Sequence, residues 1–128
     1  MKKIGQWEEL MNSNKISENV IVKLSFDFAL LVIALAEELE TKRKYVIANQ
    51  LLKSGTSIGA NIWEAQNAES KADFTHKMKI AAKECEETKY WLLLCEHSDN
   101  YPTNHNLLEK IETIQKILNK IISTSKSR

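Results

Sequence analysis

Residues 51–66, LLKSGTSIGANIWEAQ, decide the fold of this chain because they have the pattern of one amphipathic helix. The apolar residues Leu51, Ile58, Ile62 and Ala65 recur at i, i+7, i+11 and i+14, and so share one face. Polar residues form a narrow stripe on another face. We interpret this stripe as structural groups that bond neighbouring helices, with a ligand site as the alternative. The stripe consists of Gln50, Lys53, Ser54, Ser57, Asn61 and Glu64.

Two glycines, Gly55 and Gly59, lie four residues apart within this helix. Each glycine costs a helix about 1 kcal/mol relative to alanine, so an ordinary surface helix has no use for two of them. Together they leave a flat strip on which a neighbouring backbone can approach closely. The strip therefore predicts a tight helix contact, either inside one bundle or between two subunits.

Length and composition favour a few long helices over many short strands. A chain of 128 residues fits a single domain, and its 43% hydrophobic and 27% charged residues are ordinary for a globular protein. Only three glycines and one proline are available to make turns. The net charge of +1 excludes a wholesale binder of polyanions, but the charge is unevenly distributed. Residues 110–128 carry five basic side chains and one acidic side chain, so that part is +4 and the remainder is −3.

Four helical segments can be placed, at about 17–41, 45–67, 71–97 and 105–123. Ser17, Ser70 and either Thr103 or Asn104 are suitable N-cap residues. Because short turns join the segments, we expect an all-α fold, an up-down-up-down antiparallel four-helix bundle. The expected division is a lead segment at 1–16, the bundle at 17–124 and a short basic tail at 125–128.

The first helical segment has two apolar stripes side by side. Ile21, Leu24, Phe28, Leu31 and Leu35 form the stripe expected to face the bundle core. The second stripe indicates either a crowded core helix or a subunit interface, because soluble proteins rarely expose such a patch. We therefore expect a homo-oligomer. Its expected interface combines the second stripe with the glycine strip: Val22, Phe26, Ala29, Ile33, Ala36, Gly55 and Gly59.

The chemistry needed for an enzyme is missing from the sequence. The segment from Lys53 to Gly59 is glycine-rich but lacks the Gly-Lys-Ser/Thr order of a phosphate-binding loop. A di-iron bundle needs paired Glu-x-x-His motifs, and only Asp73-x-x-His76 comes close. His97 has too few partners for a zinc site. We therefore expect no enzyme activity, no catalytic residue, no cofactor, no metal and no small-molecule substrate.

The compartment follows from the cysteines and from the absence of a membrane segment. Cys85 and Cys95 lie ten residues apart on one helix, about 15 Å, which is beyond the reach of a disulfide. We interpret them as small apolar fillers in a reducing compartment. The longest apolar run, 28–36, is too short to span a membrane, and the first residues turn acidic before any apolar run develops. The sequence therefore predicts a cytoplasmic protein with no membrane partner.

The chain also resembles a known family. The resemblance lies in the motif SGTSIGANI-x-EA at 54–65 and in the segments AESKADF at 68–74 and KECEETKYWL at 83–92. These are similar to the four-helix-bundle proteins encoded in intervening sequences of bacterial 23S rRNA genes. That family is similar in turn to the accessory variability determinant of diversity-generating retroelements. The resemblance implies a homopentamer, implies nucleic-acid binding for some members, and supplies no catalytic residue.

Two hypotheses of function follow. The first is an oligomeric protein that associates with RNA or DNA through a basic end, because an antiparallel bundle places the start of the third helix beside the +4 tail. The second is a protein-interaction scaffold with no nucleic-acid role, whose partner docks on the apolar or polar stripes. Steep salt dependence of binding would distinguish the first from the second. The basic end is expected to comprise Lys71, Lys77, Lys120, Lys126 and Arg128.

Overall fold

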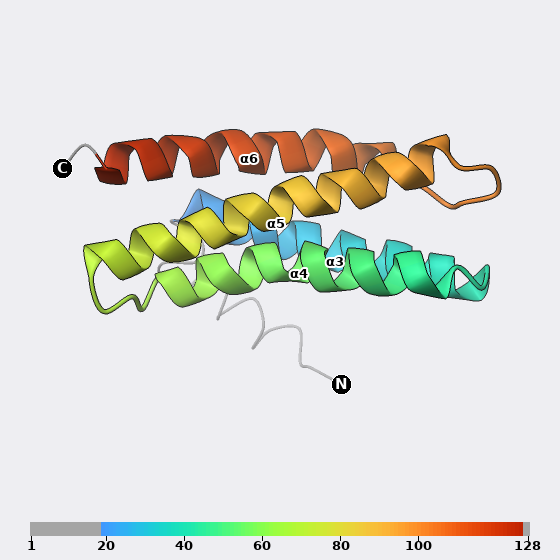
Figure 1. Ribbon diagram of the computed structural model, residues 1–128, viewed down its shortest axis with the longest axis horizontal. Coiled ribbons are helices and arrows are strands. Elements are labelled where there is room, and N and C mark those ends of the chain that lie inside the picture. Colours follow the sequence, from blue (N-terminus) through green and yellow to red (C-terminus); the bar gives the residue numbers. More distant parts are fainter. Residues whose placement is uncertain (1–18, 127–128) are drawn as a thin grey trace, which may run out of the picture.

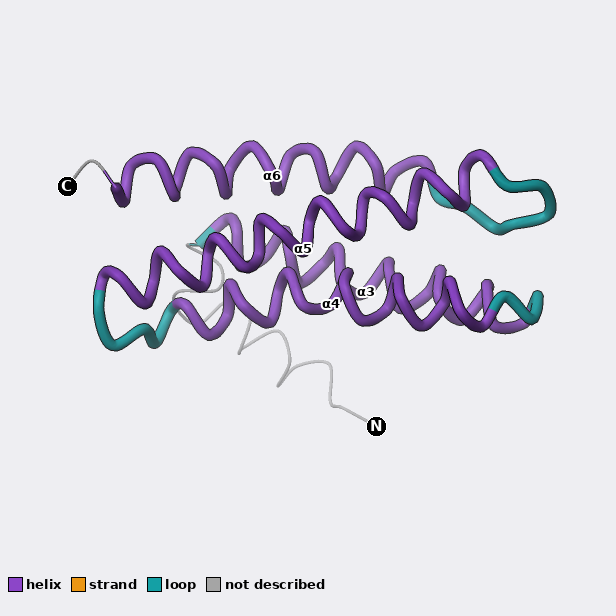
Figure 2. Tube along the Cα trace, in the orientation of Figure 1, coloured by secondary structure: helices purple, strands orange, loops and turns teal. Residues whose placement is uncertain are grey.

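A computed structural model describes residues 19–126 as a bundle of α-helices with no strand in that range (Figure 1). The helices are α3 (Val20–Thr41), α4 (Tyr45–Ala65), α5 (Lys71–His97) and α6 (His105–Lys126). Short loops join them, so consecutive helices run in opposite directions (Figure 2). Each helix packs against its two neighbours in the order α3–α4–α5–α6, and α6 closes the bundle against α3. The expected all-α four-helix bundle is confirmed. The lead segment 1–16, Ser17 and Arg128 lie outside the described residues.

Side-chain caps define where three of the helices begin. Asn19, and not the expected Ser17, caps α3, with its side-chain oxygen accepting a hydrogen bond from the Val22 N–H at 3.4 Å. Ser70 caps α5 as the sequence predicts, and its hydroxyl accepts from the Asp73 N–H at 3.0 Å. Asn104 precedes α6, where its side-chain oxygen accepts from the N–H two residues further on at 3.0 Å. Each of these starts is therefore marked by a capping residue next to it in the sequence, and the Asn19 amide also donates a hydrogen bond of 2.8 Å to Gln66 after α4.

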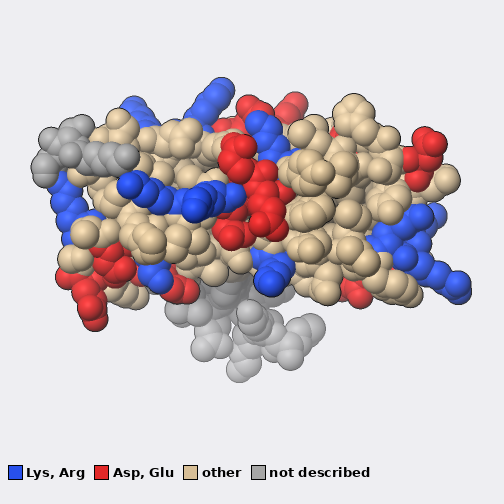
Figure 3. Space-filling model, viewed as in Figure 1, with Lys and Arg blue, Asp and Glu red and all other residues tan. Residues whose placement is uncertain are grey.

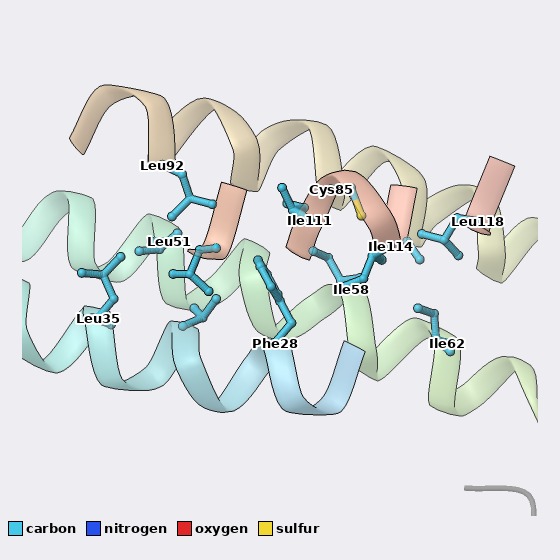
Figure 4. Close-up of a cluster of buried hydrophobic side chains, with 14 of the residues drawn as sticks. Phe28, Leu35, Leu51, Ile58, Ile62, Cys85, Leu92, Ile111, Ile114 and Leu118 are labelled. Carbon is cyan, nitrogen blue, oxygen red and sulfur yellow. The ribbon is translucent and has the colours of Figure 1, made fainter. Parts of the chain in front are cut away.

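The core runs along the bundle axis and takes side chains from every helix (Figure 4). The inner face of α5 is buried as expected, from Met78 through Cys85 to Cys95. Helix α4 contributes its predicted apolar face in full, since Leu51, Ile58, Ile62 and Ala65 are all buried. Labelled core residues are Phe28, Leu35, Leu51, Ile58, Ile62, Cys85, Leu92, Ile111, Ile114 and Leu118, each no more than 3% exposed.

Helix α3 is rotated about its own axis relative to the expected orientation. Two residues of the expected subunit interface therefore lie inside the bundle. Val22 and Ala36 are 3% and 2% exposed and belong to the core of the chain itself. Phe26 and Ala29 are half-buried, and Ile33 is 40% exposed. The reason is geometric, because the apolar surface of α3 is wide and α4 covers one edge of it. The second stripe is therefore divided between the core and the surface.

The glycine strip makes the contact that brings α4 against α3. A Cβ atom on Gly55 would lie 2.7 Å from a methyl carbon of Val32, which is closer than real side chains approach. A Cβ atom on Gly59 would lie 3.3 Å from the backbone oxygen of Ser25. Gly55 and Gly59 therefore both make a close helix contact within the bundle, which is one of the two expected uses of the strip.

Candidate nucleic-acid interface

A groove runs between the start of α5 and the end of α6, which the antiparallel arrangement places next to each other. Its volume is about 420 Å³. Phe74, Ile117 and Ile121 line it and also pack against the core, so they form its floor. Lys71 and Lys120 are exposed and stand on opposite helices at its edges. The remaining lining residues are Thr124 and Ser125.

A second hollow of about 440 Å³ adjoins this groove along the outer face of α5. It shares Lys71 and Ser125 with the groove and adds His76 and Lys79. Within the described part of the chain, neither hollow is lined by an aspartate or a glutamate. The lysines in the described lining of the two hollows are Lys71, Lys79 and Lys120.

The structure brings together only some of the residues expected to form the basic end. Lys71 and Lys120 share the groove. Lys77 instead places its ammonium 2.9 Å from Glu64 Oε1 on α4, and this hydrogen bond, with the charge of the carboxylate, raises the pKa of Lys77. Lys126 is the last residue of α6, and Arg128 lies outside the described residues. Lys79 was missed, although its spacing of eight from Lys71 places both on one helix face.

On this face of the bundle, acidic side chains gather over the middle and basic side chains lie towards both ends (Figure 3). The end at which α5 begins also carries a group of acidic side chains at its lower edge (Figure 3). Across the α5–α6 boundary, Lys89 is paired with Glu112 at 2.8 Å, and Gln115 donates a hydrogen bond to Glu86. The Lys89 ammonium lowers the pKa of Glu112 through that hydrogen bond and its charge. The acidic middle of this face would therefore repel a bound polyanion.

The polar stripe of α4 holds helices together at two points. Ser54 and Thr88 are 1% and 0% exposed and share a hydrogen bond of 2.9 Å between α4 and α5. Glu64 reaches Lys77 on α5. Asn61 donates to a backbone oxygen of its own helix at 2.8 Å, not to a neighbouring helix as expected. The other members are exposed, Gln50 and Lys53, or half-buried, Ser57. The stripe does not converge on one ligand position.

An apolar surface remains on the outer side of the α3–α4 pair. Phe26, Ala29 and Ile33 of α3 lie there, beside the 51% exposed Leu30. Trp63 of α4 is 47% exposed and follows the α3-facing Gly59 by four residues, so it lies on the same side of α4. We call these five residues the α3–α4 apolar face. Three of them, Phe26, Ala29 and Ile33, belong to the expected subunit interface.

No site for metal or thiol chemistry lies within the described range. No three His, Cys, Asp or Glu side chains there are grouped closely enough to hold a metal ion. Cys85 and Cys95 are unpaired and buried. Burial, with a smaller effect from the neighbouring Glu86 and Glu84 charges, raises the pKa of Cys85 to about 12, so the thiol stays protonated. None of the four described helices combines the length and apolar character needed to cross a membrane.

Comparison with known proteins found a matching family and a similar crystal structure. The family described as 23S rRNA-intervening sequence protein matches residues 17–120. The chain is also similar to a crystal structure from Bacteroides thetaiotaomicron, of a protein with unknown function from the S23 ribosomal protein family. The two are 41% identical, with a TM-score of 0.73, over 80% of this chain and 97% of the other. No curated protein matches the chain.

Proposed function

This chain belongs to the 23S rRNA-intervening sequence protein family, and from that premise we propose that it is a non-enzymatic, oligomeric protein that associates with RNA or DNA. The contact surface is the basic end, which we now define as Lys71, Lys79 and Lys120. The observation that carries the proposal is the placement of Lys71 and Lys120 on opposite edges of one groove, with Lys79 beside it.

The physical basis is local neutralisation of phosphates. A net charge of +1 gives the whole molecule little attraction for a polyanion, so the attraction must come from the basic end. Each lysine that contacts a phosphate releases condensed counterions, which makes affinity fall as salt rises. Three lysines in one protomer provide modest affinity, and repetition of the same surface in an oligomer would raise it by multivalency.

The proposed oligomer is a closed ring that uses the α3–α4 apolar face. Leu30 and Trp63 are each about half exposed on that face, and burial between subunits would remove their apolar surface from water. The pentameric count rests on the family resemblance, as does the relation to retroelement accessory proteins. The cytoplasm is the proposed compartment, supported by the free, buried Cys85 and Cys95.

A binding assay with charge-matched variants tests the nucleic-acid proposal. Fluorescence anisotropy would follow a labelled RNA at low salt with the wild type, Lys71→Gln/Lys120→Gln and Lys53→Gln/Lys110→Gln. The second pair removes the same charge from exposed positions outside the groove. We expect the first pair to weaken binding about tenfold and the second about twofold or less. Absence of wild-type binding, or equal losses from both pairs, would contradict the proposal.

The second candidate function is a protein-interaction scaffold that binds a partner through the α3–α4 apolar face. The exposed Trp63 favours it, because tryptophan is enriched among residues that anchor protein interfaces. Partner binding of this kind would be nearly insensitive to salt. In that case Trp63→Ala would abolish partner binding, and Lys71→Gln/Lys120→Gln would leave it unchanged.

A further inference from the structure

The groove between α5 and α6 differs from an ordinary basic surface because its floor is apolar. Phe74, Ile117 and Ile121 provide that floor, and all three are half-buried against the core. The volume of about 420 Å³ falls within the range of small-molecule sites. The outside of a nucleic-acid duplex presents phosphates and sugars, so an apolar floor gains little from it. An unpaired base, in contrast, presents a flat apolar surface that can stack on an aromatic ring.

The edges of the groove carry the groups that the rest of a nucleotide requires. Lys71 and Lys120 flank the floor from the two helices and can each reach a phosphate. The hydroxyls of Thr124 and Ser125 also line the groove and can donate to, or accept from, a base edge or a sugar. The arrangement therefore combines an apolar floor, two cations and two hydroxyls within one groove.

From this combination we propose that the groove holds one unpaired nucleotide of a bound strand, with its base against Phe74 and its flanking phosphates on Lys71 and Lys120. This inference rests on the proposed function and narrows it, because it makes single-stranded nucleic acid the preferred ligand. A base inside a duplex is stacked between its neighbours and cannot enter the groove without being extruded. The basic end would then bind a loop, a bulge or a free end in preference to a helix.

The test compares a labelled twelve-nucleotide RNA (about the span of a short strand site) with its blunt duplex. Binding of both is measured with the wild type, Phe74→Leu and Tyr90→Leu. Tyr90 is the matched control, since it is a 57% exposed aromatic on the same helix, sixteen residues beyond Phe74 and about 24 Å away along the axis. We expect Phe74→Leu to weaken single-strand binding about tenfold and to leave duplex binding unchanged. Tyr90→Leu should change neither.

A second measurement covers the possibility that Phe74→Leu destabilises the fold. The wild-type protein is photo-cross-linked to the same strand carrying halogenated uridine, and the modified peptide is identified by mass spectrometry. Cross-links at Phe74 support the proposal, and cross-links found only outside the groove overturn it. Displacement of the strand by an equimolar free mononucleotide would also overturn it, because the site would then recognise a free nucleotide.

The outcomes separate this inference from the function on which it rests. Equal affinity for strand and duplex, with no effect of Phe74→Leu, overturns the single-strand assignment and leaves the basic end as a nucleic-acid surface. Failure of the wild type to bind either RNA overturns the proposed function and the assignment together.

Discussion

Gly55→Ala tests the close approach of α3 and α4. In an unconstrained helix this change should stabilise by about 1 kcal/mol. Here the new Cβ would lie 2.7 Å and 2.9 Å from the two methyl carbons of Val32. Val32 is fully buried and β-branched, so its side chain cannot easily turn away. Overpacking of this kind costs about 1–3 kcal/mol, which outweighs or cancels the helix gain, and we therefore expect a net loss of up to about 2 kcal/mol.

The assay is thermal and urea unfolding at one fixed protein concentration, because oligomerisation would make Tm depend on concentration. A loss of about 1 kcal/mol would lower Tm by about 3–6 °C in a chain of this length. Gly59→Ala is the comparison variant, since the nearest atoms to its Cβ would be the Ser25 backbone oxygen at 3.3 Å and the Ser25 carbonyl carbon and Oγ at 3.5 Å. We expect it to cost less than Gly55→Ala.

A double variant distinguishes the clash with Val32 from a general effect on α4. Val32→Ala alone removes two buried methyl groups and should cost about 2–3 kcal/mol. Combined with Gly55→Ala, the added methyl would occupy part of the space that Val32 leaves. The double variant should then be at least about 1 kcal/mol more stable than the sum of the single effects predicts. A rise in Tm for Gly55→Ala, or strict additivity in the double variant, would refute the reasoning.

Three further predictions concern the core and the surface. Thr88→Val removes the α5 hydrogen-bond partner of the buried Ser54 and should cost about 1–3 kcal/mol of stability in urea unfolding. The same change should cost less in a Ser54→Ala background, and equal costs in both backgrounds would argue against the Ser54–Thr88 hydrogen bond. Burial raises the pKa of Cys85 to about 12, so its contribution to stability is complete below pH 9 and is lost as pH rises towards 12. Cys85→Ala should therefore flatten the alkaline decline of the free energy of unfolding, measured in urea, by up to about 1.4 kcal/mol per pH unit. An unchanged decline would contradict this. Ile33→Lys should convert the proposed oligomer to a 14.7 kDa monomer by light scattering while circular dichroism keeps its helical signal; loss of that signal would assign Ile33 to the core.

Local sequence signals predicted the helices well because most of their ends depend on near neighbours. The Ser70 cap set the start of α5, and the turn before Pro102 ended that helix at His97 as expected. The rotation of α3 was harder to predict. Its two stripes lie side by side, and the place of Val22 and Ala36 depends on how closely α4 approaches. The two glycines of α4 allow that approach, so the orientation of α3 depends on the sequence of another helix.

The candidate site was predictable in part. The antiparallel order alone brings Lys71 near Lys120, and the structure places both on one groove. Lys77 was misplaced because six residues after Lys71 the helix faces another direction, towards Glu64. The apolar floor depends on the axial offset between α5 and α6, which no local pattern fixes. For this reason the sequence indicated a basic end but gave no sign that Ile117 would meet Phe74 beneath it.

The salt dependence of RNA binding tests the account most directly. The association constant of a single-stranded RNA would be measured from about 50 to 400 mM salt for the wild type and for Lys71→Gln/Lys120→Gln. If both lysines contact phosphates, the slope of log K against log salt should be shallower in the variant by about 1.4, since each contact to a single strand contributes about 0.7. Identical slopes in the two proteins, or wild-type binding that does not change with salt, would contradict the assignment of the basic end as the nucleic-acid interface.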